Sequence, residues 1–181
     1  LADDASQLSA CLRGKGLIHL SGITLAILSP AARLTLLDVL AACRAEGAIV
    51  SFDPNYRPRL WSSTEEARES MLGLLAITDV ALASFDDEKM LWADSSPLAT
   101  LHRLLELGVR EVVVKNGAAP VHYRNRDGGG ERDTPPVTDI KDTTGAGDAF
   151  NAGYLTARLL NHAVEDALGA GQMVSALVLR H

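Results

Sequence analysis

The sequence predicts an α/β protein with a mainly parallel sheet and helices on both of its faces. Short runs of apolar and β-branched residues, typical of buried strands, alternate along the chain with longer amphipathic stretches that are typical of helices. Glycine or proline stands between most of these stretches and separates them into distinct elements. Strands that alternate with helices form parallel sheets, because each helix carries the chain back to the start of the next strand.

The composition indicates one globular domain, residues 1–181. Of the 181 residues, 47% are apolar and 22% are charged, a balance that supports a packed core. The net charge of −6 comes without a basic cluster, so nucleic acid is not an expected partner. Glycine, serine or charged residues interrupt the apolar runs before they reach the length of a membrane span, and we expect a cytoplasmic protein without membrane contact. Cys11 and Cys43 are too few for a disulfide framework or a metal site.

Four strands and one hairpin are expected. The strand segments, each apolar and bounded by turn-forming residues, are 16–23, 48–52, 79–83 and 111–117. His19 lies inside the first segment and is expected to be structural. Residues 121–124 and the glycine-rich turn at 127–130 predict a β-hairpin at the sheet edge, because this turn lacks the Lys-Ser/Thr pair and the helix of a phosphate loop.

Five helices are expected after a loop and short helix in residues 1–15. Their segments, each with apolar residues at helical spacing, are 30–46, 64–77, 97–107, 149–160 and 165–180. The first begins with Ser29 as N-cap and Pro30 at the first helical position. The residues expected on its buried face are Leu34, Leu37, Val39, Leu40 and Ala41. Gly153 is expected to allow close packing of its helix against the sheet.

The most informative stretch is residues 142–150, which read Asp-Thr-Thr-Gly-Ala-Gly-Asp-Ala-Phe and run directly into a helical segment. A glycine-rich turn that leads into a helix leaves backbone N–H groups unpaired at the positive end of the helix dipole, where phosphate binds readily. Gly145 and Gly147 allow the backbone to approach a bulky anion. Asp148 places a carboxylate beside this turn, which suggests removal of a proton from a hydroxyl that attacks phosphorus.

A second polar segment, residues 53–61, follows the second expected strand. Ligands of open α/β sheets bind just beyond the carboxyl ends of strands, where Asp53, Asn55 and Arg57 are expected to lie. Arg57 can clamp a carboxylate or phosphate in bidentate fashion. Equally, this segment can be a simple turn in which Asp53 and Asn55 cap the local backbone and the arginine is solvated.

The stretch at 142–148 resembles the signature of the PfkB (ribokinase-like) family of carbohydrate kinases, D-T-x-G-A-G-D, at every specified position. The resemblance implies that Asp148 is the catalytic base and contacts the substrate. Asp142 and Thr144 would lie near a loop that binds a monovalent cation such as K⁺. The residues that the resemblance assigns to the anion hole of the transferred phosphoryl group are Gly145, Ala146 and Gly147.

Other segments resemble the same family. The loop at 53–61 is similar to that of members that phosphorylate 2-keto-3-deoxygluconate or fructose, which implies that Asn55 lies near the ATP phosphates. Arg57 would lie near the acidic end of the substrate or the transferring group. Further residues implied to contact ATP, at the end of the fourth strand, are Lys115, Asn116 and Gly117. Ser84 and Asp87 stand where many members have Asn-x-x-Glu, a pattern linked to magnesium and phosphate handling.

The resemblance implies a ribokinase-like three-layer α/β/α sandwich in which the N-terminal portion and the small β-lid are missing. The expected reaction is ATP-dependent phosphorylation of a sugar's primary hydroxyl, with Mg²⁺ as cofactor and K⁺ as the monovalent cation that the resemblance suggests. 2-keto-3-deoxygluconate is the preferred substrate, because the segments 19–24, 53–61 and 84–88 are most similar to kinases of that sugar acid. The missing lid is the expected route to a homo-oligomer.

Three other readings compete with this one. Fructose or another ketose is the alternative sugar. A truncated remnant that binds nucleotide without turnover is an alternative of another class, which the intact motif at 142–148 argues against. A dinucleotide-dependent oxidoreductase is disfavoured, because the glycine pattern at 145–150 lacks the third glycine and comes late in the chain.

Overall fold

The computed structural model describes residues 4–181 in two compact units. The first comprises the chain up to Asn116 together with His122–Gly130, and the second comprises Gly117–Val121 and Glu131–His181. The expected short helix near the start of the chain is α1 (Ala5–Leu12), and residues 1–3 lie outside the described residues. The extent of a single kinase domain over 1–181 stays a prediction.

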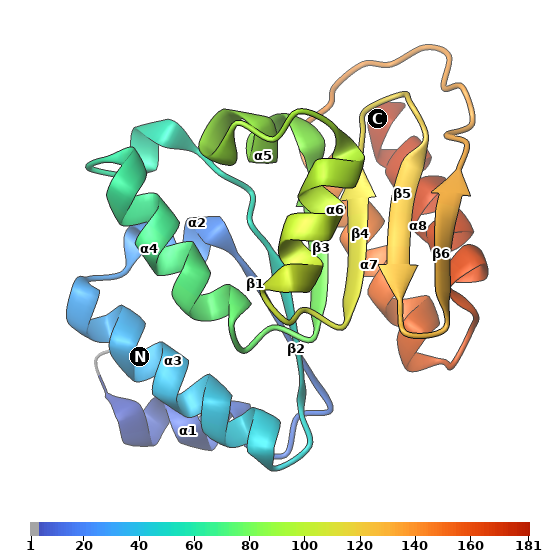
Figure 1. Cartoon of the computed structure of the whole chain (residues 1–181). Helices are drawn as coiled ribbons and strands as arrows, with labels where there is room; N and C mark the ends of the chain where they lie inside the picture. The colour runs from blue at the N-terminus through green and yellow to red at the C-terminus, as the bar shows by residue number, and fades with distance from the viewer. Residues whose placement is uncertain (1–3) are drawn as a thin grey trace. The chain divides into compact units, whose positions relative to one another are not determined.

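A six-stranded sheet forms the centre of the fold, in the spatial order β1-β2-β3-β4-β5-β6 (Figure 1). Strands β1 to β4 are parallel, and β5 is antiparallel to β4. The strands are β1 (Leu17–Ser21), β2 (Ile49–Asp53), β3 (Val80–Ser84), β4 (Glu111–Lys115), β5 (Val121–Asn125) and β6 (Gly128–Arg132). All four expected strands are therefore present, and the prediction of a mainly parallel sheet is confirmed.

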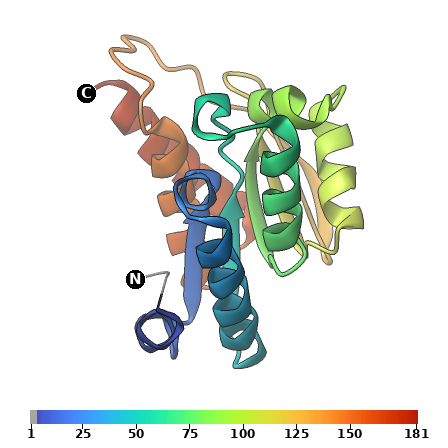
Figure 2. The same ribbon diagram turned by 90° about the vertical axis from the view of Figure 1, so that its left-hand side faces the viewer.

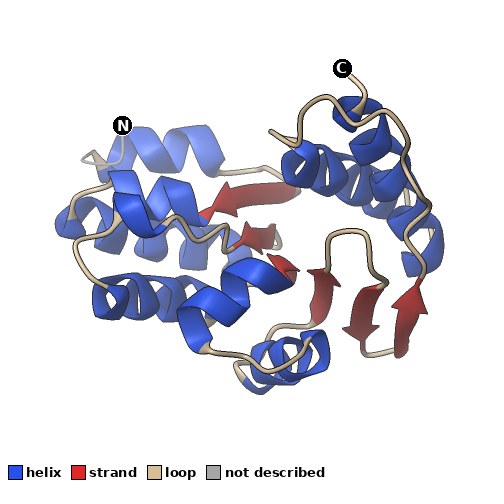
Figure 3. Ribbon diagram, turned by 90° about the horizontal axis from the view of Figure 1, so that it is seen from above, coloured by secondary structure: helices blue, strands red, loops and turns tan. Residues whose placement is uncertain are grey.

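The expected hairpin is also present, but its turn is not where the sequence suggested. β5 and β6 form the last two strands at one side of the sheet (Figure 3). The turn between them consists of Arg126 and Asp127, and the glycines at 128–130 belong to β6. A Cβ atom on Gly129 would lie 2.8 Å from the carbonyl oxygen of Tyr123, so this glycine permits close approach of the two strands.

Helices connect the parallel strands of the first unit. They are α2 (Gly22–Ile27), α3 (Pro30–Ala45), α4 (Thr64–Leu75), α5 (Phe85–Trp92) and α6 (Pro97–Glu106), with a 3₁₀ turn at Pro58–Leu60. Figure 2 shows α3 beside α4, with which it is in contact. The Ser29 hydroxyl accepts a hydrogen bond from the Ala32 N–H at 3.2 Å and Pro30 is the first residue of α3, so the predicted start of this helix is confirmed.

The buried face of α3 differs from the expected one. Leu34 is 65% exposed and Ala41 is also exposed, although Val39 and Leu40 are buried as predicted. The residues of α3 that are buried are Ala32, Arg33, Leu36, Val39, Leu40 and Cys43. Arg33 can be buried because it donates to the Leu25 carbonyl at 2.7 Å and pairs with Glu66 at 2.6 Å.

The second unit is built on two packed helices, α7 (Ala146–Leu159) and α8 (Val164–Leu179). A Cβ atom on Gly153 would lie 2.8 Å from the Ala170 carbonyl oxygen, and one on Gly171 would lie 2.9 Å from the Phe150 carbonyl oxygen. Gly153 therefore allows α7 to approach α8, and the expectation that it packs against the sheet was wrong. In the described part of the chain, no helix combines the length and apolarity needed to cross a membrane.

Candidate functional site

The carboxyl ends of β2, β3 and β4 bring together most of the polar residues that the sequence singled out in the first unit. Asp53 is the last residue of β2 and Lys115 is the last residue of β4. Asn55 and Arg57 follow β2, and Asp87 lies in the first turn of α5, directly after β3. Parallel strands end at the same edge of a sheet, so segments distant in sequence meet here.

Asp53 and Lys115 form a buried ion pair at this edge. Nζ of Lys115 lies 2.8 Å from Oδ2 of Asp53, and the two side chains are 11% and 4% exposed. The other carboxylate oxygen of Asp53 accepts a hydrogen bond from the Asn55 N–H at 3.1 Å, which closes a tight turn around Pro54. Asp53 therefore does cap local backbone, as one of the two readings of this loop expected, and also binds the lysine.

Arg57 pairs with Asp87. Its Nη1 lies 3.0 and 3.1 Å from the two carboxylate oxygens of Asp87 and donates to the Tyr56 carbonyl at 2.9 Å. The Arg57 side chain remains 50% exposed, whereas Asp87 is 15% exposed. Burial raises the pKa of Asp87, and the Arg57 guanidinium acts in the opposite direction.

Asn55 has an unusual backbone conformation, and its Oδ1 makes no hydrogen bond with the described residues. Its φ of 38° lies in the left-handed region, which asparagine tolerates better than most residues. Its Oδ1 is buried and, among the described residues, accepts no hydrogen bond. A buried polar atom without a partner is uncommon in native structures and is consistent with a ligand that supplies a donor. Asn116 and Gly117 follow β4 at the same edge, and Gly117 has a φ of 58°.

In the second unit, the stretch at 142–148 forms the start of α7. Gly145 is the N-cap with a φ of 76°, and no side chain caps this helix. The backbone N–H groups of Gly147 and Asp148 belong to the first turn, where N–H groups have no acceptor within the helix. Gly145, Gly147 and the Asp148 carboxylate are exposed. The local geometry is therefore open to an anion, with a carboxylate beside it.

Asp142 organises the approach to this turn. Its Oδ1 accepts a hydrogen bond from the Thr144 N–H at 2.9 Å. This backbone hydrogen bond, followed by those from the Thr144 side chain and the Thr143 backbone, lowers the pKa of Asp142. Residues 4–181 contain no group of three His, Cys, Asp or Glu side chains that could hold a metal ion. The role of Asp142 and Thr144 near a monovalent cation stays a prediction.

Two residues of the first unit take parts that sequence reasoning did not assign. The sequence places Asp53 either at the ligand-binding end of a strand or in a local cap, and its lysine partner lies 62 residues away, so no local pattern signals the pair. Glu88, on α5, is fully buried, and its Oε2 accepts a hydrogen bond from Nη2 of Arg103 at 2.5 Å. Ser84 is the N-cap residue of α5, and its side chain makes no capping hydrogen bond.

The parallel sheet, its polar carboxyl edge and the glycine turn before α7 are features that α/β proteins use to bind phosphate groups. The family model for pfkB family carbohydrate kinases matches residues 5–181. The chain belongs to this family.

Named relatives agree with this assignment. The chain is 43% identical over 182 residues to the 2-dehydro-3-deoxygluconokinase of Dickeya dadantii (strain 3937), and the match covers 98% of this chain and 58% of that protein. Among solved structures, a PfkB protein from Polaromonas sp. JS666 has a TM-score of 0.82 at 29% identity, covering 98% of this chain and 56% of that one. An E. coli protein assigned as ribokinase II, solved with ATP and Mg²⁺, has a TM-score of 0.82 at 27% identity, covering 96% and 55%.

These neighbours confirm the predicted ribokinase-like fold. They also show that the chain spans little more than half the length of the relatives that it matches, 58% for the D. dadantii protein.

Proposed function

We propose that this chain carries the nucleotide-binding and catalytic half of an ATP-dependent kinase that phosphorylates the primary hydroxyl of 2-keto-3-deoxygluconate. The observation that carries the proposal is the start of α7, where the family signature forms an uncapped glycine turn with an exposed carboxylate in its first turn. Phosphoryl transfer requires positioning and charge stabilisation more than covalent chemistry, and this arrangement can supply both.

In this mechanism Asp148 accepts the proton of the attacking hydroxyl. Gly145, Ala146 and Gly147 supply backbone N–H groups to the transferring phosphoryl group, since no side chain caps the first turn of α7. In the structure the Ala146 N–H donates to the Thr143 carbonyl at 3.3 Å, a contact that the phosphoryl group would replace. The helix dipole adds partial positive charge at the same end. The donors therefore lie where negative charge develops, beside the base.

The nucleotide is proposed to contact residues at the ends of strands β2 and β4. Oδ1 of Asn55 is buried and has no hydrogen-bond partner among the described residues, which fits a ligand contact. Asn116 and Gly117 follow β4, and Lys115 ends it. Mg²⁺, when bound with ATP, would neutralise charge on the phosphate oxygens. K⁺ near Asp142 and Thr144 is part of the same proposal, supported by the ordered turn between these two residues.

The sugar acid is proposed because of Arg57. This half-exposed guanidinium uses Nη1 for its contacts with Asp87 and Tyr56, so its remaining N–H donors can bind a carboxylate. The relative from D. dadantii carries the name 2-dehydro-3-deoxygluconokinase, which refers to the same compound as 2-keto-3-deoxygluconate. A cytoplasmic location and a homo-oligomer remain parts of the proposal.

ADP release in the presence of Mg·ATP tests the proposal. The panel contains 2-keto-3-deoxygluconate, fructose and ribose, and the assay uses this chain in parallel with any longer chain that its gene encodes. ADP release that depends on the sugar acid supports the proposal. ADP release with fructose alone would change the proposed substrate to a ketose. Binding of ATP without turnover of any sugar, in every length of the chain, would favour a nucleotide-binding protein without catalysis.

A further inference from the structure

The ion pair between Asp53 and Lys115 joins two strands that are not neighbours. Asp53 ends β2 and Lys115 ends β4, and β3 lies between these strands in the sheet. The lysine side chain therefore crosses the carboxyl end of β3 to reach Oδ2 of Asp53, 2.8 Å away. A long side chain held almost out of solvent in one geometry loses conformational freedom and hydration, so the pair is not incidental to this edge of the sheet.

Asp53 transmits this constraint to the loop that follows it. Its other oxygen accepts from the Asn55 N–H at 3.1 Å, across Pro54, and Asn55 takes a φ of 38°. The Pro54 carbonyl packs on Gly22, where a Cβ atom would lie only 1.9 Å from the carbonyl oxygen. The loop then ends at Arg57, which is held by Asp87. None of these contacts uses Oδ1 of Asn55.

We infer that the Asp53–Lys115 pair fixes the loop at residues 54–57 in the conformation that the kinase site requires, so that both residues are positioning residues. This inference rests on the proposed function and changes it at one residue: Lys115, counted above among the nucleotide contacts, supports the site through Asp53 and Asn55 and does not contact phosphate. A lysine drawn away to a phosphate group would take its ammonium from the 3% exposed Asp53, and removing one partner of a buried ion pair is costly.

Three variants distinguish a positioning role of Lys115 from direct contact with phosphate. In Asp53→Asn the side chain has one carbonyl oxygen for two donors, the Asn55 N–H and the Lys115 ammonium, so the connection is broken while the shape is kept. Lys115→Met removes the ammonium, and the double variant removes both charges of the pair. Arg44→Met is the matched control, because Arg44 pairs with the buried Asp79 immediately before β3, at the opposite ends of the strands.

The measurements are kcat and KM for the sugar acid, the affinity for Mg·ATP, and hydrogen exchange of the Asn55 N–H by NMR. Positioning predicts that Asp53→Asn and Lys115→Met each lower kcat by roughly 10- to 100-fold, with ATP affinity nearly unchanged. The double variant is expected to be no worse than the poorer single variant, because both remove the same connection. Asn55 exchange rises in both single variants, and Arg44→Met leaves kcat and this exchange unchanged.

A direct phosphate contact predicts the opposite pattern. Asp53→Asn would then free the ammonium and leave ATP binding equal or tighter, while Lys115→Met would weaken it; this pair of results would overturn the inference. Unchanged kcat in folded variants would likewise reduce the pair to a stabilising contact. If the unaltered protein phosphorylates no sugar, the proposed function fails, yet Asn55 exchange still decides whether Lys115 holds the loop.

Discussion

Arg57 and Asp87 link the loop after β2 to the first turn of α5, with Nη1 of Arg57 3.0 Å from one Asp87 oxygen and 3.1 Å from the other. A single nitrogen makes both contacts. The contacts of Nη1 therefore orient the guanidinium, while half of the side chain stays exposed to a ligand. An arginine oriented in this way can bind a planar carboxylate through its remaining donors.

The first prediction concerns Arg57→Lys. Lysine keeps the charge but cannot pair with Asp87 and a carboxylate in the same geometry. We expect kcat/KM for 2-keto-3-deoxygluconate to fall by roughly 10- to 100-fold, the equivalent of one charge-assisted hydrogen bond, mainly through KM. Steady-state kinetics check this, with Arg59→Lys as the control at an exposed neighbouring arginine. An equal loss for neutral fructose would show that Arg57 does not read the carboxylate.

Asp148→Asn tests the proposed base. Asparagine has almost the same shape, so the glycine turn and the start of α7 should persist, but it cannot accept the hydroxyl proton. We expect kcat to fall by roughly 10²- to 10⁴-fold, as for loss of a general base, while the affinity for Mg·ATP hardly changes. Asp166→Asn is a matched control, because Asp166 is an exposed acid in the first turn of α8. Retained kcat in Asp148→Asn would remove the base assignment.

The strands and the signature stretch could be predicted from sequence because both are local patterns. Buried parallel strands are short apolar runs, and all four expected runs form strands β1 to β4. The helices were harder to orient. In α3 the apolar residues at 34, 37 and 41 and those at 36, 40 and 43 both recur at intervals of three and four residues, and only tertiary contacts decide which set is buried.

Polar residues in the interior were the least predictable part. Arg33 on α3 can be buried because it pairs with Glu66 and donates a hydrogen bond to the Leu25 carbonyl. Its guanidinium carbon also lies over the ring of Trp61, 4.9 Å from the centroid. The Asp53–Lys115 pair likewise depends on the order of strands in the sheet. Such pairs join segments that the fold alone brings together, so neither residue differs locally from an exposed charge.

A third prediction compares two glycines of α8. Gly171→Ala would place a methyl group 2.9 Å from the Phe150 carbonyl oxygen, so α7 and α8 must move apart. We expect a loss of roughly 1–3 kcal/mol in the free energy of unfolding, typical of overpacking. Gly169→Ala is the control on the same helix, since its nearest neighbour is the flexible Arg132 side chain at 3.1 Å. It should be neutral or stabilise the helix by up to about 1 kcal/mol.

Urea unfolding of both variants measures the difference. If Gly171→Ala proved as stable as Gly169→Ala, the close contact between α7 and α8 would not depend on a glycine at this position.

The fourth prediction concerns the pH dependence of stability, which arises from Glu88. This side chain is fully buried, and its Oε1 has no partner among the described residues. Its partner Arg103, on α6, also pairs with Asp94. Burial raises the pKa of Glu88 from 4.5 to about 7; Arg103 opposes the shift, and the charges of Asp94 and Asp53 add to it.

The sign of the effect follows from proton binding. Between pH 4.5 and about 7 the folded chain holds a proton on Glu88 that the unfolded chain has released. Stability therefore falls as pH rises through this window, by on the order of 3 kcal/mol in total from this group. Glutamine stays neutral at every pH and can still accept the hydrogen bond from Arg103.

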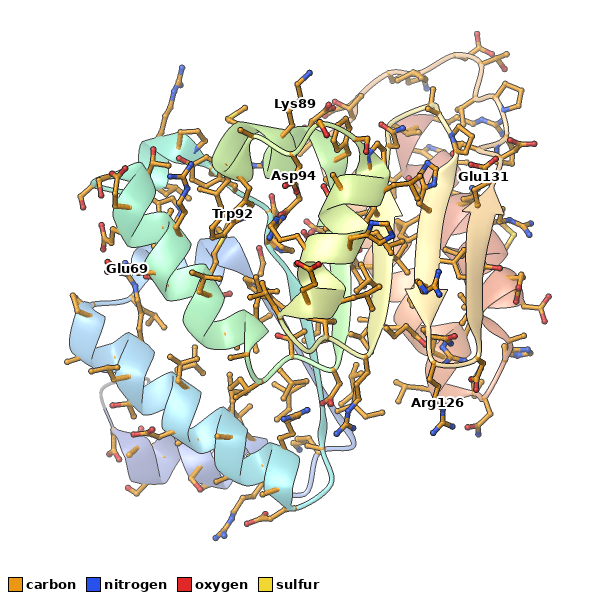
Figure 4. All side chains as sticks on the ribbon, in the orientation of Figure 1. Glu69, Lys89, Trp92, Asp94, Arg126 and Glu131 are labelled. Atoms are coloured by element: carbon orange, nitrogen blue, oxygen red, sulfur yellow. The ribbon has the colours of Figure 1, made fainter. Side chains whose placement is uncertain are left out.

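Glu88→Gln should consequently gain stability relative to the unaltered chain as pH increases from 5 to 8. Urea unfolding at several pH values measures this difference, and Glu69→Gln is the control, because Glu69 is an exposed glutamate on α4 (Figure 4). A constant difference between Glu88→Gln and the unaltered chain across this range would mean that Glu88 is ionised throughout. In that case Arg103, with its hydrogen bonds to both Glu88 and Asp94, would outweigh the cost of burial.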